Sequence, residues 1–188
     1  MDEAARKRRL FIALGLDDAT RSRCAAVAEE LRRTGFEARY ESADKYHVTL
    51  AFLGNVTPVQ VEPIAAAMQA AAASLPGFTI LLDKLGGFPH ERRPRVVVIG
   101  ARAQGAAFRE LARTLRETYE ALGFSFKTDA VAHVTIARVK APRRALPSVE
   151  FAPISLDVSA LSLFESLPSA QHNTSRYLTC RSAKLAVA

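Results

Sequence analysis

The pentapeptide HVTLA at His47–Ala51 returns as HVTIA at His133–Ala137, in a chain of 188 residues that holds only four histidines. Each copy alternates polar and apolar residues, and this period of two predicts a β-strand. In both halves of the chain, an apolar strand and a helical segment precede the pentapeptide. The same order of elements, used twice, predicts an α+β protein with two similar lobes.

The remaining elements are expected where apolar runs end at turn or cap residues. Strands are expected over Leu10–Leu16, His47–Leu53, Phe78–Leu85, Arg95–Gly100, His133–Val139, Ile154–Phe164 and Arg176–Leu185. Helices are expected between Asp17 or Asp18 and Gly35, from Thr57-Pro58 to the residues before Pro76-Gly77, and over about Gln104–Leu122. The pair Gly54-Asn55 predicts a turn directly after the second strand. No linker rich in Pro, Gly or Ser separates the halves, so residues 1–188 are expected to form a single bilobal domain.

Strand periodicity divides the side chains of the two pentapeptides between two faces. One face is expected to carry the polar residues and one alanine: His47, Thr49 and Ala51 in the first copy, and His133, Thr135 and Ala137 in the second. The other face is expected to be a buried apolar row: Val48, Leu50 and Phe52, and then Val134 and Ile136, with Arg138 following less regularly. The small alanine leaves an open floor in front of each imidazole. If the two lobes face each other, two imidazoles and two hydroxyls meet in one space.

Two imidazoles and two hydroxyls together suit one kind of chemistry. Histidine titrates near neutral pH, so one ring can act as a general base while the other acts as a general acid. Threonine hydroxyls donate hydrogen bonds to non-bridging phosphoryl oxygens without help from a metal. A single His-x-Thr strand is usually structural, but two copies with the same pattern and face indicate a shared site. The set matches hydrolysis of a cyclic phosphodiester, in which one imidazole deprotonates water and the other protonates the departing ribose oxygen.

Charge indicates the class of partner. The 26 Lys and Arg residues exceed the 19 Asp and Glu residues, which gives a net charge of +7 and a pI near 9.8. Such an excess favours a polyanion such as nucleic acid. The two cysteines, Cys24 and Cys180, fit neither a zinc spacing nor a disulfide framework. No apolar run approaches the ~18–20 residues of a membrane span, and no A-x-A-like cleavage site follows Leu16, so the chain is expected in a reducing cytoplasm and away from membranes.

Other motifs argue against a metal site and a nucleotide-binding loop. A zinc site is not expected, because the sequence lacks H-E-x-x-H and C-x₂-C. Gly100–Gly105 has the glycine spacing of a P-loop, but Ala106-Ala107 replace the Lys and the Ser or Thr that bind phosphate. His90, in the loop GGFPHERRP, has no ligand spacing to another residue and is not expected to be catalytic. His172 lies in a polar turn and is expected to be solvated, unless a loop brings it over the cleft.

Basic and aromatic residues supply candidate contacts to RNA. Arg92-Arg93-Pro94-Arg95 and the pair Arg143-Arg144 are either solvated loop residues or contacts along a phosphate backbone, where salt would weaken binding. A terminal base can stack on a phenylalanine ring, and the candidates are Phe52, Phe88 and Phe126. The sequence does not separate such a ring from one that packs in the core.

The two pentapeptides with their flanks, HVTLAFLGNV and AHVTIAR, resemble the paired H-x-T-x motifs of the two-histidine phosphoesterase superfamily. More narrowly, the chain resembles the RNA 2′,3′-cyclic phosphodiesterase family, formerly called 2′-5′ RNA ligases. Further likeness lies in RLFIALGLDD near the start, in GGFPHERRPRVVVIGAR in the middle and in LSLFESLPSAQHNTSRYLTCRSAKL near the end. The resemblance therefore covers most of the chain, with the segments in the family's order.

The resemblance implies a bilobal α+β fold, with two pseudo-symmetric lobes of sheet and helix around a central cleft. It implies metal-independent opening of an RNA 2′,3′-cyclic phosphate to a 2′-phosphate, without a cofactor. By motif order, His47 would be the proton donor and His133 the proton acceptor. The phosphate would be bound by Thr49 and Thr135. Arg138 follows the second motif as in the family, and is expected to contact the phosphate or the strand end. The chain departs from the family at Ala132, where family members often carry proline.

Three functions remain open at this point. The first is a cyclic phosphodiesterase that acts as a monomer on RNA ends or on nucleotides with the cyclic group, with reversible 2′-5′ RNA joining as a further reaction. The second is a module that binds RNA ends without turnover. The third is an enzyme of the same fold for a small cyclic nucleotide or a 2′-5′ oligonucleotide. The two intact His-x-Thr pairs favour catalysis, because a module that only binds RNA has no need of two imidazoles.

Overall fold

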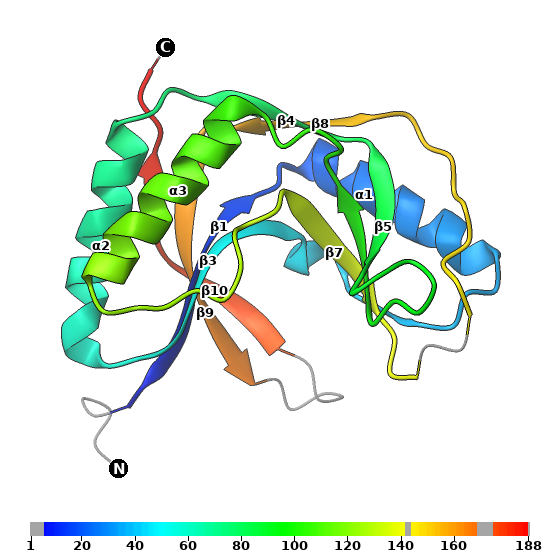
Figure 1. The fold of residues 1–188 in the computed structure, drawn as a ribbon, viewed down its shortest axis with the longest axis horizontal. Helices are drawn as coiled ribbons and strands as arrows, with labels where there is room; N and C mark the ends of the chain where they lie inside the picture. The colour runs from blue at the N-terminus through cyan, green and yellow to red at the C-terminus, as the bar shows by residue number, and fades with distance from the viewer. Residues whose placement is uncertain (1–5, 142–143, 169–174, 188) are drawn as a thin grey trace.

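The computed structural model describes residues 6–141, 144–168 and 175–187 and consists of helices and strands (Figure 1). The α-helices of this part of the chain are α1 (Asp18–Arg33), α2 (Pro58–Ala73) and α3 (Ala106–Ala121). The strands are β1 (Arg8–Gly15), β2 (Arg39–Tyr40), β3 (His47–Val56), β4 (Phe78–Leu82), β5 (Lys84–Phe88), β6 (Val96–Gly100), β7 (His133–Arg138), β8 (Ile154–Val158), β9 (Ala160–Pro168) and β10 (Ser175–Lys184). A short 3₁₀ helix, η2 (Ala43–Lys45), precedes β3. The α+β class expected from the sequence is confirmed.

Each helix begins or ends close to where local sequence signals predict. At the start of α1, the Asp17 carboxylate accepts a hydrogen bond from the Thr20 amide at 2.6 Å, so Asp17 rather than Asp18 is the N-cap residue. Gly35 follows α1 with a φ of 70°, a left-handed conformation that is strained for residues with a Cβ. Pro58 occupies the first position of α2, where its missing N–H costs nothing. Pro63 lies inside α2 and does not delay its start.

The helices bury one face each. The buried residues include Cys24, Val27, Ala28 and Leu31 in α1, Ile64, Ala65 and Met68 in α2, and Phe108, Leu111, Leu115 and Tyr119 in α3. Their spacings of three and four residues are those of a single helix face. The buried Tyr119 hydroxyl donates a hydrogen bond to the Ile64 carbonyl at 3.2 Å, which ties α3 to α2. Across the described residues, no helix has the length and apolar character needed to cross a membrane.

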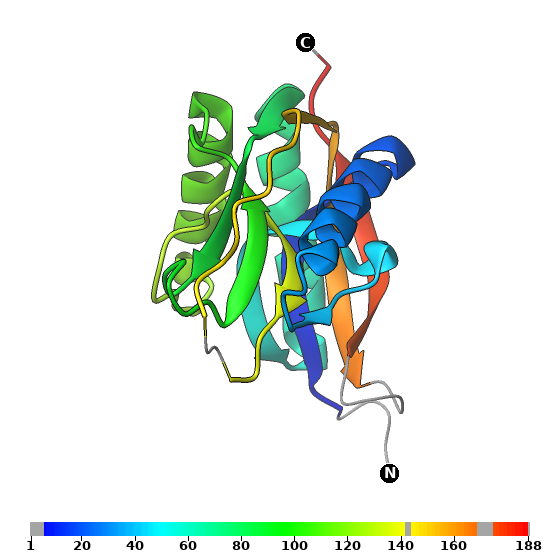
Figure 2. The ribbon, with the colours of Figure 1, turned by 90° about the vertical axis from the view of Figure 1, so that its right-hand side faces the viewer.

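One sheet runs through both lobes. Its strand order is β10-β9-β1-β3-β7-β6-β5, with β2 paired to β7 outside this path, and neighbouring strands are antiparallel. Between β3 and β7 the pairing is limited to Val48 opposite Val134, so the sheet is narrowest where its two halves meet. Helices α2 and α3 lie together beside one half and α1 beside the other, as Figure 1 and the turned view in Figure 2 show. The two-lobed arrangement expected from the sequence is confirmed.

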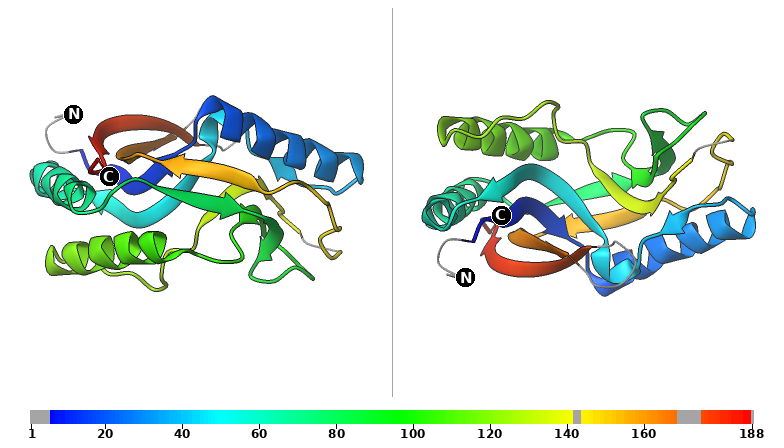
Figure 3. Two further views of the ribbon diagram at one scale, coloured as in Figure 1. Left: turned by 90° about the horizontal axis from the view of Figure 1, so that it is seen from above. Right: turned by 90° about the horizontal axis from the view of Figure 1, so that it is seen from below.

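The lobes are not the two halves of the sequence, contrary to the expectation from the repeated order of elements. Strands β9 and β10 come from the end of the chain, but they extend the half of the sheet that contains β1 and β3. In Figure 3 the blue N-terminal strand accordingly lies between cyan β3 and the orange and red C-terminal strands. Helix α1, from the beginning of the chain, contacts β7 and β8 instead. Each element packs where its apolar face is buried. Which other elements bury that face depends on the tertiary structure and not on the order of elements in the sequence.

Two predicted strands are each divided, and one predicted turn is wrong. The run Ile154–Phe164 breaks at Ser159, so β8 pairs with β4 in a separate two-stranded sheet while β9 pairs with β1. The run Phe78–Leu85 breaks at Asp83, and its second part, β5, pairs with β6. No turn forms at Gly54-Asn55, because β3 continues to Val56. Gly54 instead has a φ of 72° at an irregularity in the pairing with β1, where glycine relieves the strain of a bulge.

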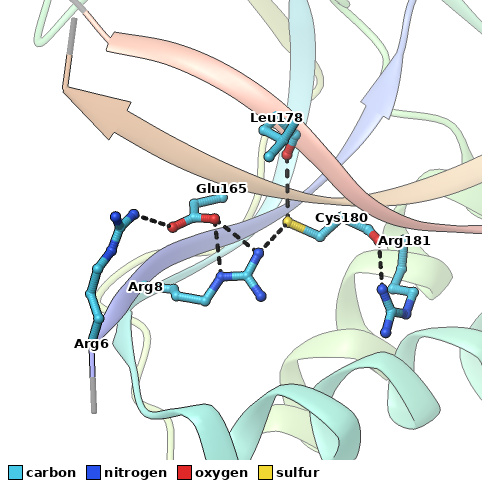
Figure 4. Close-up of polar contacts among 6 residues, drawn as sticks. All are labelled: Arg6, Arg8, Glu165, Leu178, Cys180 and Arg181. Atoms are coloured by element: carbon cyan, nitrogen blue, oxygen red, sulfur yellow. Dashed lines mark hydrogen bonds and ion pairs between the residues drawn. The ribbon is translucent and has the colours of Figure 1, made fainter. Parts of the chain in front are cut away.

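A buried carboxylate fastens the first strand to the C-terminal strands (Figure 4). Glu165 of β9 is 5% exposed, and its two oxygens accept hydrogen bonds from Arg6 at 3.1 Å and from Nε of Arg8 at 3.0 Å. A further contact, of 3.0 Å, joins Arg8 to the Sγ of Cys180 on β10. Two guanidinium groups offset the cost of burying one carboxylate. These contacts hold β1, β9 and β10 together on the side of the sheet that faces the start of α2.

Candidate active site

The pairing of β3 with β7 brings the two His-x-Thr segments together. Val48 lies opposite Val134 in this antiparallel register. The residues on either side therefore meet as His47 with Thr135, and as Thr49 with His133. The register thus directs all four side chains to one place, at the narrow middle of the sheet.

A β-bulge changes which residues follow His47 and Thr49 on the cleft face. The register of β1 and β3 slips between Ile12, which is opposite Ala51, and Ala13, which is opposite Thr49. The extra residue reverses the alternation, so Ala51 is buried (3% exposed) and Phe52 is exposed (47%). The expectation that Ala51 forms the floor of the cleft while Phe52 is buried is therefore wrong.

The second motif has the same irregularity. The register of β6 and β7 slips directly after Thr135, so Ala137 is fully buried rather than at the floor of the cleft. Arg138 then stands on the cleft side, in the position that Phe52 has in the first motif. Each strand therefore presents a histidine, a threonine and one further residue to the cleft, an aromatic ring from β3 and a guanidinium group from β7.

The side chains on this face surround a cavity of about 540 Å³. The predicted site residues in its lining are His47, Thr49, Thr135 and Arg138. Further lining residues include Arg9, Phe11, Arg39, Glu41, Lys45, Phe52 and Tyr177. Four cationic side chains against one carboxylate make the cavity attractive to anions. His133 is not among the residues that line this cavity, but it lies on β7 two residues before Thr135, and a positive charge on its ring lowers the pKa of His47.

Both histidines have one ring nitrogen occupied in the same way. Nδ1 of His47 lies 2.7 Å from the Lys45 carbonyl oxygen, and Nδ1 of His133 lies 2.8 Å from the Val131 carbonyl oxygen. Because a carbonyl oxygen only accepts, Nδ1 is the donor in both rings. Nε2 is consequently the atom of each ring that can take or give a proton.

The two imidazoles differ in their aromatic neighbours. The rings of Phe11 and Tyr177 lie 5.0 and 5.1 Å from the ring of His47, measured between centroids. His133 has Phe88 at 5.2 Å, in an edge-to-face arrangement. Aromatic rings on more than one side restrict the rotamers of His47.

Burial lowers the pKa of both histidines below the ordinary value of 6.5. The positive charges of His133 and Arg138 lower the pKa of His47 further, while its hydrogen bond to the Lys45 carbonyl opposes the shift. For His133, the hydrogen bond to the Val131 carbonyl raises the pKa, and the positive charge of Arg138 lowers it. An anion bound in the cavity would favour the protonated form of an adjacent ring, because opposite charges attract.

These lowered pKa values predict how stability depends on pH. As the pH falls below 6.5, the unfolded chain takes up protons at His47 and His133 before the folded protein does, so the free energy of unfolding decreases. The variant His47→Asn/His133→Asn should lose this part of the dependence, at most about 1.4 kcal/mol per pH unit for each proton. Urea unfolding between about pH 7.5 and about pH 5.5 measures it. Equal pH dependence in the variant and the wild type would contradict the lowered values.

Glu41 is the carboxylate of the site, and it holds two arginines. Its Oε1 accepts hydrogen bonds from Nε of Arg138 at 2.9 Å and from Nη2 of Arg39 at 3.4 Å. The Glu41 amide donates to the Ile136 carbonyl at 2.9 Å, which attaches the residue to β7. The carboxylate is thus fixed at both its backbone and its side chain, and it orients the Arg138 guanidinium along the wall of the cavity.

The three candidate stacking rings differ in position. Phe52 is exposed in the cavity lining, with the Arg9 guanidinium 4.8 Å from the centre of its ring. Phe88 is exposed beside His133. Phe126 packs against the hydrophobic core. Phe52 and Phe88 are therefore placed to meet a base at the site, and Phe126 is not.

The remaining candidates from the sequence lie elsewhere. His90 is in an exposed loop and accepts a hydrogen bond from the Arg93 amide at 3.2 Å, which is a structural role. His172 and Arg143 lie outside the described residues. In the part of the chain that the structure describes, no three His, Cys, Asp or Glu side chains gather as a metal-ion site requires.

Two residues of the site, Tyr177 and Glu41, were not predicted as site residues, although Tyr177 lies in the C-terminal segment that resembles the family. Tyr177 lies on β10, and Glu41 lies between β2 and η2. Their surroundings in the sequence, SRYLTC and RYESAD, hold no spacing that indicates a site. Glu41 lies shortly before the first motif, which is the only hint of its role in the sequence. Acidic residues are common on protein surfaces, so this position alone does not identify a site residue.

Known proteins share both the sequence pattern and the fold. The family model described as LigT-like phosphoesterase matches residues 14–98 and 99–172, which include both His-x-Thr segments. The protein of Aeropyrum pernix named RNA 2′,3′-cyclic phosphodiesterase is 31% identical, over 79% of this chain and 88% of that protein. The protein of the same name from Thermotoga maritima is 28% identical, over 84% of this chain and 86% of that protein.

Solved structures extend the likeness to the tertiary level. A protein of Thermus thermophilus has a TM-score of 0.80 and 27% identity, covering 95% of this chain and 98% of that one. Escherichia coli LigT complexed with 3′-AMP has a TM-score of 0.75 and 27% identity, again covering 95% of this chain and 98% of that one. The match to the family model spans most of the sequence and includes the strands that form the cavity. The chain belongs to the family of LigT-like phosphoesterases.

Proposed function

We propose that this LigT-like phosphoesterase hydrolyses the 2′,3′-cyclic phosphate at RNA ends or on nucleosides, and leaves a 2′-phosphate. The observation that carries the proposal is the matched pair of imidazoles, His47 and His133. Each has Nδ1 held by a carbonyl oxygen and Nε2 left for proton transfer, beside one basic cavity. Adding water across a phosphorus–oxygen bond requires that one proton be removed and one be supplied, and two such rings can do both.

In the proposed step, Nε2 of neutral His133 takes a proton from a water molecule as the water oxygen attacks phosphorus. The bond between phosphorus and the ribose 3′ oxygen breaks, and the Nε2–H of protonated His47 gives its proton to that oxygen. The product has a 2′-phosphate and a 3′-hydroxyl, and exchange of one proton at each ring with solvent restores the starting state. The donor and acceptor are assigned by the order of the two motifs in the family.

The other polar groups of the cavity are proposed to bind the phosphate. Thr49 and Thr135 line the cavity beside the histidines, where their hydroxyls can donate to the non-bridging oxygens. Arg138, held by Glu41 at 2.9 Å, adds a positive charge that attracts the phosphate and stabilises charge that develops on its oxygens. These donors are already oriented before the reaction, so the transition state gains their interactions without further reorganisation.

The relatives support the class of substrate. Proteins of Aeropyrum pernix and Thermotoga maritima are named RNA 2′,3′-cyclic phosphodiesterase, and a structure of Escherichia coli LigT holds 3′-AMP. We extend the nucleotide partner to this chain. The proposed groups all come from one copy of the chain, so we propose that both lobes form one catalytic domain that acts as a monomer. The free thiols Cys24 and Cys180 suit the reducing cytoplasm in which we place it.

The purified protein in the presence of EDTA is expected to convert a nucleoside 2′,3′-cyclic phosphate into the 2′-phosphate, because the proposed step uses side chains alone. Chromatography against authentic 2′- and 3′-phosphates identifies the product isomer. Absence of turnover, or turnover only after a metal ion is added, would contradict the proposal. A 3′-phosphate product would show that the 2′ oxygen, not the 3′ oxygen, is the leaving group.

The same assay separates the alternative functions. Binding of RNA ends without any product would identify a binding module. Faster turnover of a 2′-5′ oligonucleotide than of the 2′,3′-cyclic phosphate would identify a different phosphodiesterase of the same fold. Adding RNA with a 5′-hydroxyl tests the joining reaction, in which that hydroxyl takes the place of water.

A further inference from the structure

A second cavity, of about 560 Å³, adjoins the candidate active site. Arg39 and Arg138 line both cavities, and form the wall between them. The rest of the second cavity is lined by residues 35–38, which follow α1, and by residues 139–141 and 144, which follow β7. The two cavities therefore lie next to each other, with these two guanidinium groups between them.

The second cavity is strongly basic. Its lining has four cationic side chains and one carboxylate: Arg39, Arg138, Lys140, Arg144 and Glu37. The Arg144 guanidinium lies over the ring of the buried Phe36, 5.3 Å from its centroid, and this cation–π contact holds it at the wall. Among the described residues, Lys140 and Arg144 form no ion pair with a carboxylate. Two positive charges are thus available to an anionic ligand.

Cations next to a phosphate-binding cavity fit a second phosphate of the same ligand. In an RNA chain, the nucleotide that carries the cyclic phosphate is joined through its 5′ oxygen to a phosphodiester, whereas a free nucleoside cyclic phosphate has no group there. The two cavities have nearly equal volumes, about 540 and 560 Å³. A single inorganic anion is much smaller than either cavity. Two consecutive nucleotides of one RNA strand match the two neighbouring cavities better.

We propose that the second cavity is a subsite for the phosphodiester on the 5′ side of the terminal nucleotide, with Lys140 and Arg144 as its contacts. This inference rests on the proposed function and names its substrate class, which is RNA chains in preference to free nucleoside cyclic phosphates. Arg138 then lies between the two phosphates, held there by Glu41 at 2.9 Å. Contacts to phosphate carry no information on base sequence, so the preference is for chain length and not for a particular base.

The experiment compares kcat/KM for a nucleoside 2′,3′-cyclic phosphate with kcat/KM for di- and trinucleotides that end in the same group. The wild-type protein is expected to prefer the dinucleotide about tenfold, the effect of charge-assisted contacts at a partly exposed site. Lys140→Met/Arg144→Met should remove most of this preference. On the mononucleotide the same variant should stay within about twofold of wild type, because neither residue lines the first cavity.

Arg113→Met/Lys127→Met is the matched control. It removes the same charge from two exposed residues that line neither cavity. This control should keep the preference for the dinucleotide. The salt dependence is a second readout, since kcat/KM for the dinucleotide should fall less steeply with rising salt in the Lys140/Arg144 variant, which has lost two cationic contacts.

The results distinguish failure of the subsite from failure of the proposed function. Equal kcat/KM of the wild type on mono- and dinucleotide would overturn the subsite and leave the function intact, as would equal losses of the Lys140/Arg144 variant on both substrates. A loss of the preference in the Arg113/Lys127 control as well would show that net charge alone matters, which also overturns the subsite. Turnover of none of these substrates by the wild type would overturn the proposed function itself.

Discussion

His47→Ala and His133→Ala are each expected to lower kcat on a nucleoside 2′,3′-cyclic phosphate by about 10²–10⁴-fold. Each change removes one of the two groups that move protons in the proposed step, while the other imidazole and Arg138 remain. RNA ends should still bind, because the proposed phosphate contacts are kept, so KM should change far less than kcat. Initial rates over a range of substrate concentrations measure both quantities.

The control for these variants is His90→Ala, since His90 lies in an exposed loop and should leave kcat unchanged. Near-wild-type activity of either active-site variant would contradict the acid–base assignment. A cyclic substrate with sulfur in place of the 3′ oxygen separates the two roles, because a thiolate leaves without being protonated. On that substrate His47→Ala should recover most of its activity and His133→Ala should stay slow. The opposite result would exchange donor and acceptor.

Thr49→Val and Thr135→Val are each expected to lower kcat by about 10²–10³-fold, the effect of removing one preoriented donor from a developing negative charge. Valine has nearly the shape of threonine and suits a strand, so β3 and β7 should keep their backbone while the hydroxyl is lost. The loss should appear in kcat more than in KM, because the hydroxyls bind most tightly to the charge of the transition state.

Serine variants show whether the hydroxyl itself is responsible. Thr49→Ser and Thr135→Ser keep the donor and should retain most of the activity. If serine and valine cause equal losses, the threonine acts through packing and the phosphate-binding role is wrong. Thr79→Val serves as the control, because Thr79 is an exposed strand residue that bonds to Asp157 at 2.7 Å and should not affect kcat.

Local structure follows from patterns that span only a few residues. Gly35 ends α1 and Pro58 begins α2 because capping depends on backbone conformation at single positions. The side chains of His47 and His133 share a face with their threonines because alternation is a property of an extended strand. The candidate acid–base pair could be predicted for that reason, together with the repetition of its pattern.

The errors at the site have a common cause. Alternation predicts Ala51 on the cleft floor and Phe52 in the core, but the structure reverses these positions. The bulge that reverses them is defined by how β3 pairs with its neighbour β1, so the sequence of β3 alone does not contain it. A corresponding bulge in β7 brings Arg138 to the cleft face.

The sequence by itself determined the three helices, the approximate positions of most strands and the α+β class. It also determined the two histidines and threonines that we propose as catalytic and phosphate-binding residues, because all of these depend on neighbouring residues in the chain. Only the tertiary structure decided that β9 and β10 join the half of the sheet with β1 and that α1 packs against β7. It also decided that Glu41 and Tyr177 reach the cavity, and that Lys140 and Arg144 line a second cavity beside it. These features arise when surfaces distant in sequence bury their apolar faces together, and no local pattern records which surfaces will meet.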